Sequence, residues 1–313
     1  MFGFILRRLL SGVVLLFVIS TLAYMLLYVG GGNIARRILG QQATAETVAQ
    51  KTTELGLDRP LLVQYIDWLS HAVTGDFGTS WFTGEMVSSG ITSRLGVTLS
   101  IVIGATVITA IVAVIIGVWA AVRGGWVDKV VQGVSILGFA IPGFLIALGL
   151  VTLFALNLKW FKPTGYVPLT ESATGWLATV TLPIIALAIG GIAGVAQQVR
   201  GSVVDALQRD YVRTLRSRGL SFNRVVFKHV LRNAGGPALA VLAVQFVGLL
   251  GGAVIVERIF AIPGLGQVAV TATSQGDIPM VMGLVVAIAA MVVIINLLID
   301  LLQGWLNPKV RLA

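Results

Sequence analysis

Residues 199–236 read VRGSVVDALQRDYVRTLRSRGLSFNRVVFKHVLRNAGG and separate two long apolar runs. This basic loop carries eight Lys or Arg residues but only two acids, Asp205 and Asp210. The chain around it differs sharply, since 57% of all 313 residues are hydrophobic and only 11% are charged. Soluble domains carry about a quarter charged residues, so this composition indicates a membrane protein. The net charge of +9 then reflects basic loops rather than nucleic-acid binding.

Six apolar runs are long enough for transmembrane helices, which need about 20 such residues. The expected spans cover about residues 9–29, 96–122, 130–156, 177–198, 236–256 and 280–302. The first run is longer than the core of a usual signal peptide and lacks an A-x-A cleavage site, which favours an uncleaved span. Pro142 and Pro183 lie in or at the start of these runs, where each removes a backbone donor and favours a kink. The sequence therefore predicts an all-α membrane protein with six spans.

The charge distribution predicts the orientation. With the N-terminus inside, the cytoplasmic pieces are residues 1–8, 123–129, 199–235 and 303–313, and they hold most of the chain's 22 Lys and Arg. The opposite loops hold slightly more acids than bases. Because cytoplasmic loops collect Lys and Arg, we expect both termini in the cytoplasm.

The long piece after the first span is expected to form a small helical segment outside the membrane. Thr44 can cap a helix that runs to Leu55, with Gly56 at its C-terminal turn. Asp58-Arg59-Pro60 then opens a second helix. Its apolar residues recur at helical spacing and predict one buried face. They are Leu62, Tyr65, Ile66, Leu69 and Val73.

These expectations divide the chain into four parts. Residues 1–29 form the first span, and residues 30–95 form the extracytoplasmic helical segment. Residues 96–303 form a core of five spans with the basic loop at 199–235, and residues 304–313 form a cytoplasmic tail.

The basic loop itself has the composition of two helices. Asp205 to Arg218 contains no Gly or Pro and favours a helix that Gly219 would end. Ser221 can cap a second helix to about Asn233. Gly235-Gly236-Pro237 is then expected to separate this helix from the fifth span. The loop could contact anionic lipid headgroups, or its apolar centre and cationic rim could fit a groove on a protein.

Several kinds of chemistry find no support in the sequence. There is no cysteine, no P-loop motif, no H-E-x-x-H or G-x-S-x-G motif, and no paired carboxylates within a span. His71 and His229 are predicted on opposite sides of the membrane, so no metal site is expected. Glu257 and Asp300 lie within about a turn of a membrane surface, where solvation of a charge is cheap. The sequence therefore disfavours an ion-coupled carrier, and energy would have to come from a partner.

The basic loop resembles the cytoplasmic signature of ABC importer permeases, and in particular of the peptide/nickel group. Arg213-Thr214-Leu215 stands where that family has E-A-A, and Gly219 stands at its glycine. The loop departs from the general pattern by lacking the Glu at 213, but the peptide subgroup departs in the same way. The residues that the resemblance implies for coupling to an ATPase are Asp210, Tyr211, Arg213, Thr214, Leu215, Arg218, Gly219, Leu220, Ser221, His229 and Leu231. For Tyr211, Leu215 and Leu220, packing against the chain's own spans is the alternative.

Further motifs resemble the B-type permease subunit of that family along nearly the whole chain. They are Leu55 to Pro60 with Gln64-Tyr65, Gly75 to Ser80, Ile141-Pro142-Gly143-Phe144, and Glu257 to Gly266. From these segments the candidates for the translocation path or its gate are Pro142, Phe144, Glu257, Phe260, Pro263, Gly264 and Leu265. A plain surface turn is the alternative for Pro263-Gly264, since P-G is a turn signal by itself.

The resemblance implies a type I ABC importer permease in the bacterial plasma membrane. Its implied partners are a homologous second permease, two ATP-binding subunits, an extracytoplasmic binding protein and the lipid bilayer. The chain would not be an enzyme and would hold no cofactor, because ATP and Mg²⁺ belong to the ATPase subunits. Cargo would move by alternating access. Di- or oligopeptides are the expected cargo, with nickel, haem or glycosides as alternatives and an ion-coupled carrier ranked below them.

Overall fold

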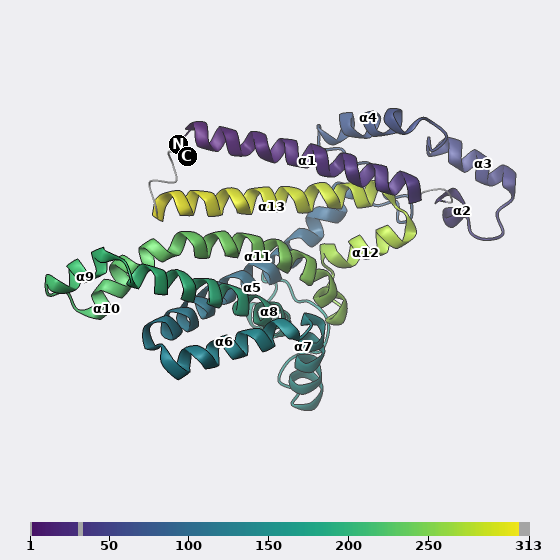
Figure 1. Ribbon diagram of the computed structural model, residues 1–313. Coiled ribbons are helices and arrows are strands. Elements are labelled where there is room, and N and C mark those ends of the chain that lie inside the picture. Colours follow the sequence, from purple (N-terminus) through teal and green to yellow (C-terminus); the bar gives the residue numbers. More distant parts are fainter. Residues whose placement is uncertain (1, 31–33, 307–313) are drawn as a thin grey trace. The chain divides into compact units, whose positions relative to one another are not determined.

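The computed structural model describes residues 2–30 and 34–306, and it is built from helices (Figure 1). The only β-pairing among the described residues is an isolated bridge between Thr79 and Met86. The helices in chain order are α1 (Phe2–Gly30), α2 (Ile34–Leu39), α3 (Ala45–Glu54), α4 (Leu61–Ala72), α5 (Val87–Arg123), α6 (Gly125–Ala140), α7 (Gly143–Leu150), η1 (Val151–Asn157), α8 (Ala173–Leu207), α9 (Asp210–Ser217), α10 (Phe222–Val225), η2 (Val226–Val230), α11 (Leu231–Ile259), α12 (Leu265–Gln275) and α13 (Ile278–Leu306). The all-α prediction is confirmed.

Five helical stretches among the described residues are long and apolar enough to cross a membrane, and one of them joins α10, η2 and α11. They include residues Ile5–Tyr28, Val87–Arg123, Ala173–Leu207, Phe222–Ile259 and Ile278–Gly304. A sixth crossing exists if the bent pair Gly125–Gly138 and Gly143–Asn157 is one span.

The expected third span at 130–156 is not one straight helix. Its two halves meet at 92°, with Ile141 in an extended conformation and Pro142 at the N-cap of α7. The physical reason is local: proline has no N–H to donate, and its ring disfavours helical geometry in the residue before it. The proline therefore produces a full break rather than the expected kink.

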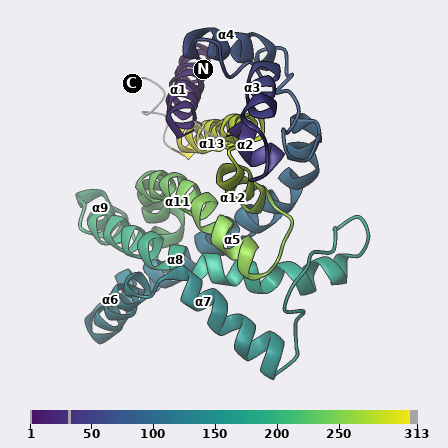
Figure 2. The same cartoon turned by 90° about the vertical axis from the view of Figure 1, so that its right-hand side faces the viewer.

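The chain forms two compact units. One consists mainly of Thr98–Ile262, and the other of Ile5–Val97 with Pro263–Val293. In the first unit, α8 packs against α11, α6 and α7, as the two views show from different sides (Figures 1 and 2). Part of α5 also approaches α8 closely, since a Cβ added to Gly117 would lie 2.7 Å from the carbonyl oxygen of Ala196. Glycine permits this contact because it has no side chain.

The second unit is organised around the C-terminal half of α1, α4 and the start of α13. Its buried cluster consists of Tyr24, Ile34, Tyr65, Ile278 and Met282. The helix caps predicted for the segment are present, because Thr44 Oγ1 accepts from Thr47 N at 3.3 Å and Gly56 has a φ of +66°.

The buried face predicted for α4 is largely wrong. Tyr65 is buried and Leu69 is half-buried, but Leu62, Ile66 and Val73 are exposed. Gln64 is buried in their place, because its amide donates to the carbonyl oxygens of Arg59 at 2.7 Å and Leu57 at 3.4 Å.

The basic loop also differs from its prediction at two points. The chain breaks at Arg209, which is extended, so the helix expected from Asp205 to Arg218 is divided between α8 and α9. The expected separation at Gly235-Gly236-Pro237 is absent, and residues Phe222–Ile259 run on as one helical stretch. Glycine and proline are tolerated within membrane helices because neighbouring groups satisfy the freed backbone atoms.

Candidate functional site

The two short helices of the basic loop meet at Gly219, as expected. We call residues Asp210 to Val230 the elbow. Gly219 has a φ of +83°, its N–H donates to the carbonyl oxygen of Arg216 at 3.0 Å, and Leu220 N–H donates to that of Leu215 at 3.2 Å. This is the Schellman arrangement that ends a helix in a left-handed residue. Because a Cβ at Gly219 would meet nothing within 4 Å, the backbone conformation alone explains the glycine.

An apolar cluster lies beneath the elbow. Val212, Val225, Val226 and Val230 are buried in it, with Ala206 from the end of α8. The half-buried side chains packed against it include Tyr211, Leu215, Leu220 and Leu231. These four residues therefore contribute to the elbow's own core, and only their exposed edges are available to a partner.

The exposed surface of the elbow is cationic, and it holds the side chains of five of the eleven predicted coupling residues. Its exposed residues include Asp210, Arg213, Thr214, Arg216, Arg218, Ser221, Arg224 and Lys228. Arg213 approaches Asp210 only at 3.9 Å, with side chains 82% and 98% exposed, and such a pair contributes little. His229 is half-buried, and its carbonyl oxygen accepts from Asn233 Nδ2 at 3.1 Å.

Two features of this surface were missed from the sequence. Phe227 is 68% exposed in η2, amid the basic residues. Arg216 lies over the ring of Phe222, with 5.4 Å from its guanidinium carbon to the ring centroid. At 100° per residue, Phe227 lies about 110° from the mean direction of the buried Val225, Val226 and Val230, so a helical wheel could have placed it on the exposed side.

Arg200 is not part of the exposed cationic surface. Its guanidinium makes a two-pronged ion pair with Asp128 on α6, where Nη2 lies 2.5 Å from Oδ2 and Nε contacts Oδ1. Gln132 Nε2 also donates to Asp128 Oδ2 at 3.1 Å. Both charged side chains are largely covered. This pair ties α6 to the helix that leads into the elbow.

A polar cavity of about 460 Å³ lies where α8, α9 and α11 meet. Its lining includes Ser202, Asp205, Arg209, Tyr211 and Asn233. The Tyr211 hydroxyl is buried and has no protein partner, so the cavity offers it space for water.

Of the predicted gate residues in the first unit, two are buried and two are exposed. Glu257 is fully buried, and Thr98 Oγ1 donates to its Oε1 at 2.6 Å, so the expected cheap solvation of this carboxyl group is wrong. Phe260 is 1% exposed, and its carbonyl oxygen accepts from Gly165 N at 2.9 Å. By contrast, Pro142 and Phe144 are exposed at the start of α7.

The remaining gate residues belong to the second unit. Gly264 and Leu265 are buried at the start of α12, whereas Pro263 is exposed and lines a cavity of about 320 Å³. The Glu85–Arg94 ion pair, with 3.3 Å between Oε1 and Nη1, lines the same cavity. Of these three residues, Pro263 is thus the one that reaches open space.

The motif Gly75 to Ser80 is explained by a buried carboxylate. Asp277 is 2% exposed, and it accepts hydrogen bonds from Ser80 Oγ at 2.5 Å and from Trp81 N at 3.2 Å. Gly78 has a φ of +80°, and Asp76 Oδ1 accepts from its N–H at 2.9 Å. The motif therefore closes a tight loop onto the start of α13.

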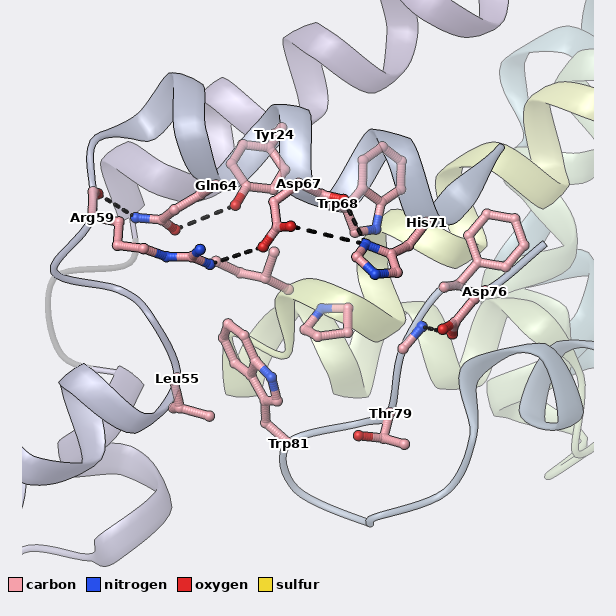
Figure 3. Close-up of a pocket in the computed structure, with 14 residues that line it drawn as sticks. Tyr24, Leu55, Arg59, Gln64, Asp67, Trp68, His71, Asp76, Thr79 and Trp81 are labelled. Carbon is pink, nitrogen blue, oxygen red and sulfur yellow. Dashed lines mark hydrogen bonds and ion pairs between the residues drawn. The ribbon is translucent and has the colours of Figure 1, made fainter. Parts of the chain in front are cut away.

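A second cavity of about 320 Å³ lies beside α4 (Figure 3). Arg59 donates to Asp67 at 3.1 Å, and His71 lies next to Asp67. Trp68 and Trp81 form aromatic walls. The Trp68 Nε1 atom is buried without a protein partner. Among the described residues, no three His, Asp or Glu side chains are placed to hold a metal ion.

Comparison with known proteins gives full-length matches. The family described as the inner membrane component of binding-protein-dependent transport systems matches residues 113–312, and its N-terminal family matches residues 1–102. A probable peptide ABC transporter permease of Sinorhizobium fredii is 36% identical over 98% of this chain and 99% of its own. A putative peptide transport permease of Brucella abortus is 38% identical, and a glutathione transport system permease of Salmonella choleraesuis is 34% identical, each over 99% of both chains.

A solved structure shares the fold. A chain of the MetNI methionine ABC transporter, in an inward-facing conformation, matches with a TM-score of 0.56 and 15% identity. The match covers 69% of this chain and 96% of that one.

Proposed function

Because this chain belongs to the inner membrane permease family of binding-protein-dependent ABC importers, we propose that it carries di- or oligopeptides, glutathione among them. A member of this family works with an ATPase and a binding protein, spans the inner membrane several times and is not itself catalytic. The names of the similar permeases, two for peptides and one for glutathione, support this choice of cargo.

The elbow is the proposed point where ATP hydrolysis acts on this subunit. One observation carries the proposal: residues Phe222–Ile259 form a continuous stretch of 38 residues that begins in the elbow. At 1.5 Å per residue, α11 alone, with 29 residues, is about 44 Å long, enough to cross the bilayer. A displacement of the elbow therefore moves the far end of the same helix. Rigid-body coupling of this kind requires such a stiff element.

The elbow's surface suits an ATPase subunit. Its apolar cluster gives it a firm base, and its exposed residues include Phe227 as well as Arg213, Arg216 and Arg218. An apolar centre with a polar rim is the usual anatomy of a protein interface. We propose that two ATPase subunits and a homologous second permease complete the importer, and that both termini lie in the cytoplasm.

In this scheme, closure of the ATPases on ATP moves the two elbows, and the spans change from inward-open to outward-open. The binding protein then releases cargo into the outward-open cavity. This chain contributes binding, coupling and a path across the bilayer, and no covalent step.

Cross-linking tests the elbow. The chain has no cysteine, so single Cys variants can be made directly. In the assembled complex, Arg213→Cys and Phe227→Cys should cross-link to the ATPase subunit, whereas Glu46→Cys on α3 should not. Cross-linking of Glu46→Cys alone, or of no elbow variant, would contradict the proposed contact. Cargo is tested separately by uptake of labelled dipeptide against nickel in proteoliposomes of the same complex.

A further inference from the structure

Helix α4 presents an apolar strip that no part of its own compact unit covers. Leu62 is 64% exposed, Ile66 is 62% exposed and Val73 is 81% exposed. Their spacing of four and seven residues places them on one face of the helix, with half-buried Leu69 between them. The polar residues Asp67 and His71 fall on a different face. The helix is therefore amphipathic, with its apolar strip turned away from the protein.

The other side of α4 is fixed against a membrane span. The Tyr65 hydroxyl lies 3.1 Å from Ser20 Oγ and 2.8 Å from Thr21 Oγ1, and its ring lies 6.5 Å from that of Phe17. All three partners belong to α1, within the apolar run Ile5–Tyr28. Figure 1 shows α4 lying alongside the C-terminal half of α1.

These contacts set a depth for α4. Ser20 precedes the end of the apolar run at Tyr28 by eight residues, which corresponds to about 12 Å along the helix. Met282, which shares the cluster with Tyr65, follows the start of α13 at Ile278 by four residues, or about 6 Å. Both spans thus place Tyr65 below the ends of their apolar runs and not above them.

The aromatic side chains around α4 agree with this depth. Tyr24, Tyr65 and Trp68 form ring contacts with centroids 5.4–6.3 Å apart. Trp81 packs against the same cluster. Tyr and Trp gather where the bilayer meets water, because each has an apolar body and a polar tip. The cluster marks such a boundary, and α4 lies at its level.

We propose that α4 is an interfacial membrane helix, with Leu62, Ile66 and Val73 among the lipid acyl chains and with Asp67 and His71 toward water. Amphipathic helices of this kind sink about 5–10 Å into the boundary between headgroups and acyl chains, which matches the depth of Tyr65. The strip continues the lipid-facing surface of α1, where Val13, Val14 and Phe17 are also exposed. The extracytoplasmic segment is therefore anchored in the bilayer and does not stand clear of it.

The proposed orientation of the chain places α4 in the outer leaflet of the membrane. The depth of α4 in the bilayer does not depend on that orientation or on the cargo. A failure of the proposed peptide transport would leave this inference intact.

Site-directed spin labelling tests the depth directly. Single variants Leu62→Cys, Ile66→Cys and Val73→Cys are labelled with nitroxide in the assembled importer, reconstituted in phosphatidylethanolamine–phosphatidylglycerol vesicles. Collisions with oxygen and with a water-soluble nickel chelate are compared at each label. Val14→Cys on α1 serves as the lipid control and Glu46→Cys on α3 as the water control, since both positions are exposed.

The oxygen-to-nickel collision ratio at the three α4 positions should exceed that of Glu46→Cys about tenfold and stay below that of the deeper Val14→Cys, because polar solutes are excluded from hydrocarbon. High nickel collision at these labels would place the strip in water and overturn the proposal. Low collision with both reagents would place it against another protein subunit and overturn it equally. All three native side chains are exposed, so loss of packing does not confuse the result.

Discussion

Gly219 offers the sharpest test of the elbow, because its requirement is purely one of backbone conformation. Its φ of +83° lies in the left-handed region, and no atom would clash with a side chain there. A non-glycine residue in that region costs about 1–2 kcal/mol. That cost corresponds to a factor of about 5–30 in the equilibrium between the native elbow and any relaxed form. Asparagine tolerates the region better than other residues, and β-branched residues tolerate it least.

We therefore expect a graded series. In the assembled importer, cargo transported per ATP hydrolysed should fall in the order glycine, Gly219→Asn, Gly219→Ala and Gly219→Val. The valine variant should lose most of its coupling while it stays inserted and assembled. Gly201→Ala is a matched control, because that glycine lies inside α8 with open space around it and no left-handed φ. This control should keep normal coupling.

The assay is uptake of labelled dipeptide and release of phosphate, measured on the same proteoliposomes. Normal coupling in Gly219→Val would show that the left-handed turn at Gly219 does not transmit motion to the spans. If Gly219→Asn were as damaging as Gly219→Val in an assembled complex, the cause would be the side chain at the docking surface and not backbone strain.

Three further perturbations test how the helices are held together. Asp128→Asn should lower the free energy of unfolding of the permease by about 1 kcal/mol, because it weakens a partly covered ion pair. The double variant Asp128→Asn/Arg200→Gln should lose less free energy of unfolding than the sum of the two single variants. Thr98→Val should cost about 1–3 kcal/mol, since the buried carboxyl group of Glu257 loses a donor at 2.6 Å, and equal melting temperatures for variant and parent would contradict this. Gly117→Ala should destabilise the protein by about 1–3 kcal/mol, because the new methyl group would press on α8; chemical denaturation in detergent measures it.

Much of this architecture follows from local rules that the sequence displays. The end of α9 at Gly219 and the start of α3 at Thr44 each depend on one residue and its immediate neighbours, so they were predictable. Charge and apolar length likewise predict spans without reference to packing.

Other features depend on contacts that no local rule contains. The break at Arg209 comes before Val212, which packs with Val225 and Val226 from the next turn of the elbow and with Val195 and Val199 from α8. Pro237 is accommodated inside α11 although the same sequence ends helices in water. The buried side of α4 is chosen by hydrogen bonds of Tyr65 and Gln64 to groups outside that helix. Its periodicity correctly predicted an apolar strip but assigned that strip to the protein interior.

We expect this permease to move cargo only when a partner hydrolyses ATP. The most direct measurement compares two sets of proteoliposomes, one with the complete importer and one with both permeases but no ATPase subunits. The binding protein, loaded with labelled dipeptide, is added outside the vesicles. The dipeptide should accumulate only in the first set, and only when ATP is present on the side of the membrane where the elbow lies. Sustained uptake by the permeases alone, driven by an ion gradient or by none, would contradict the account.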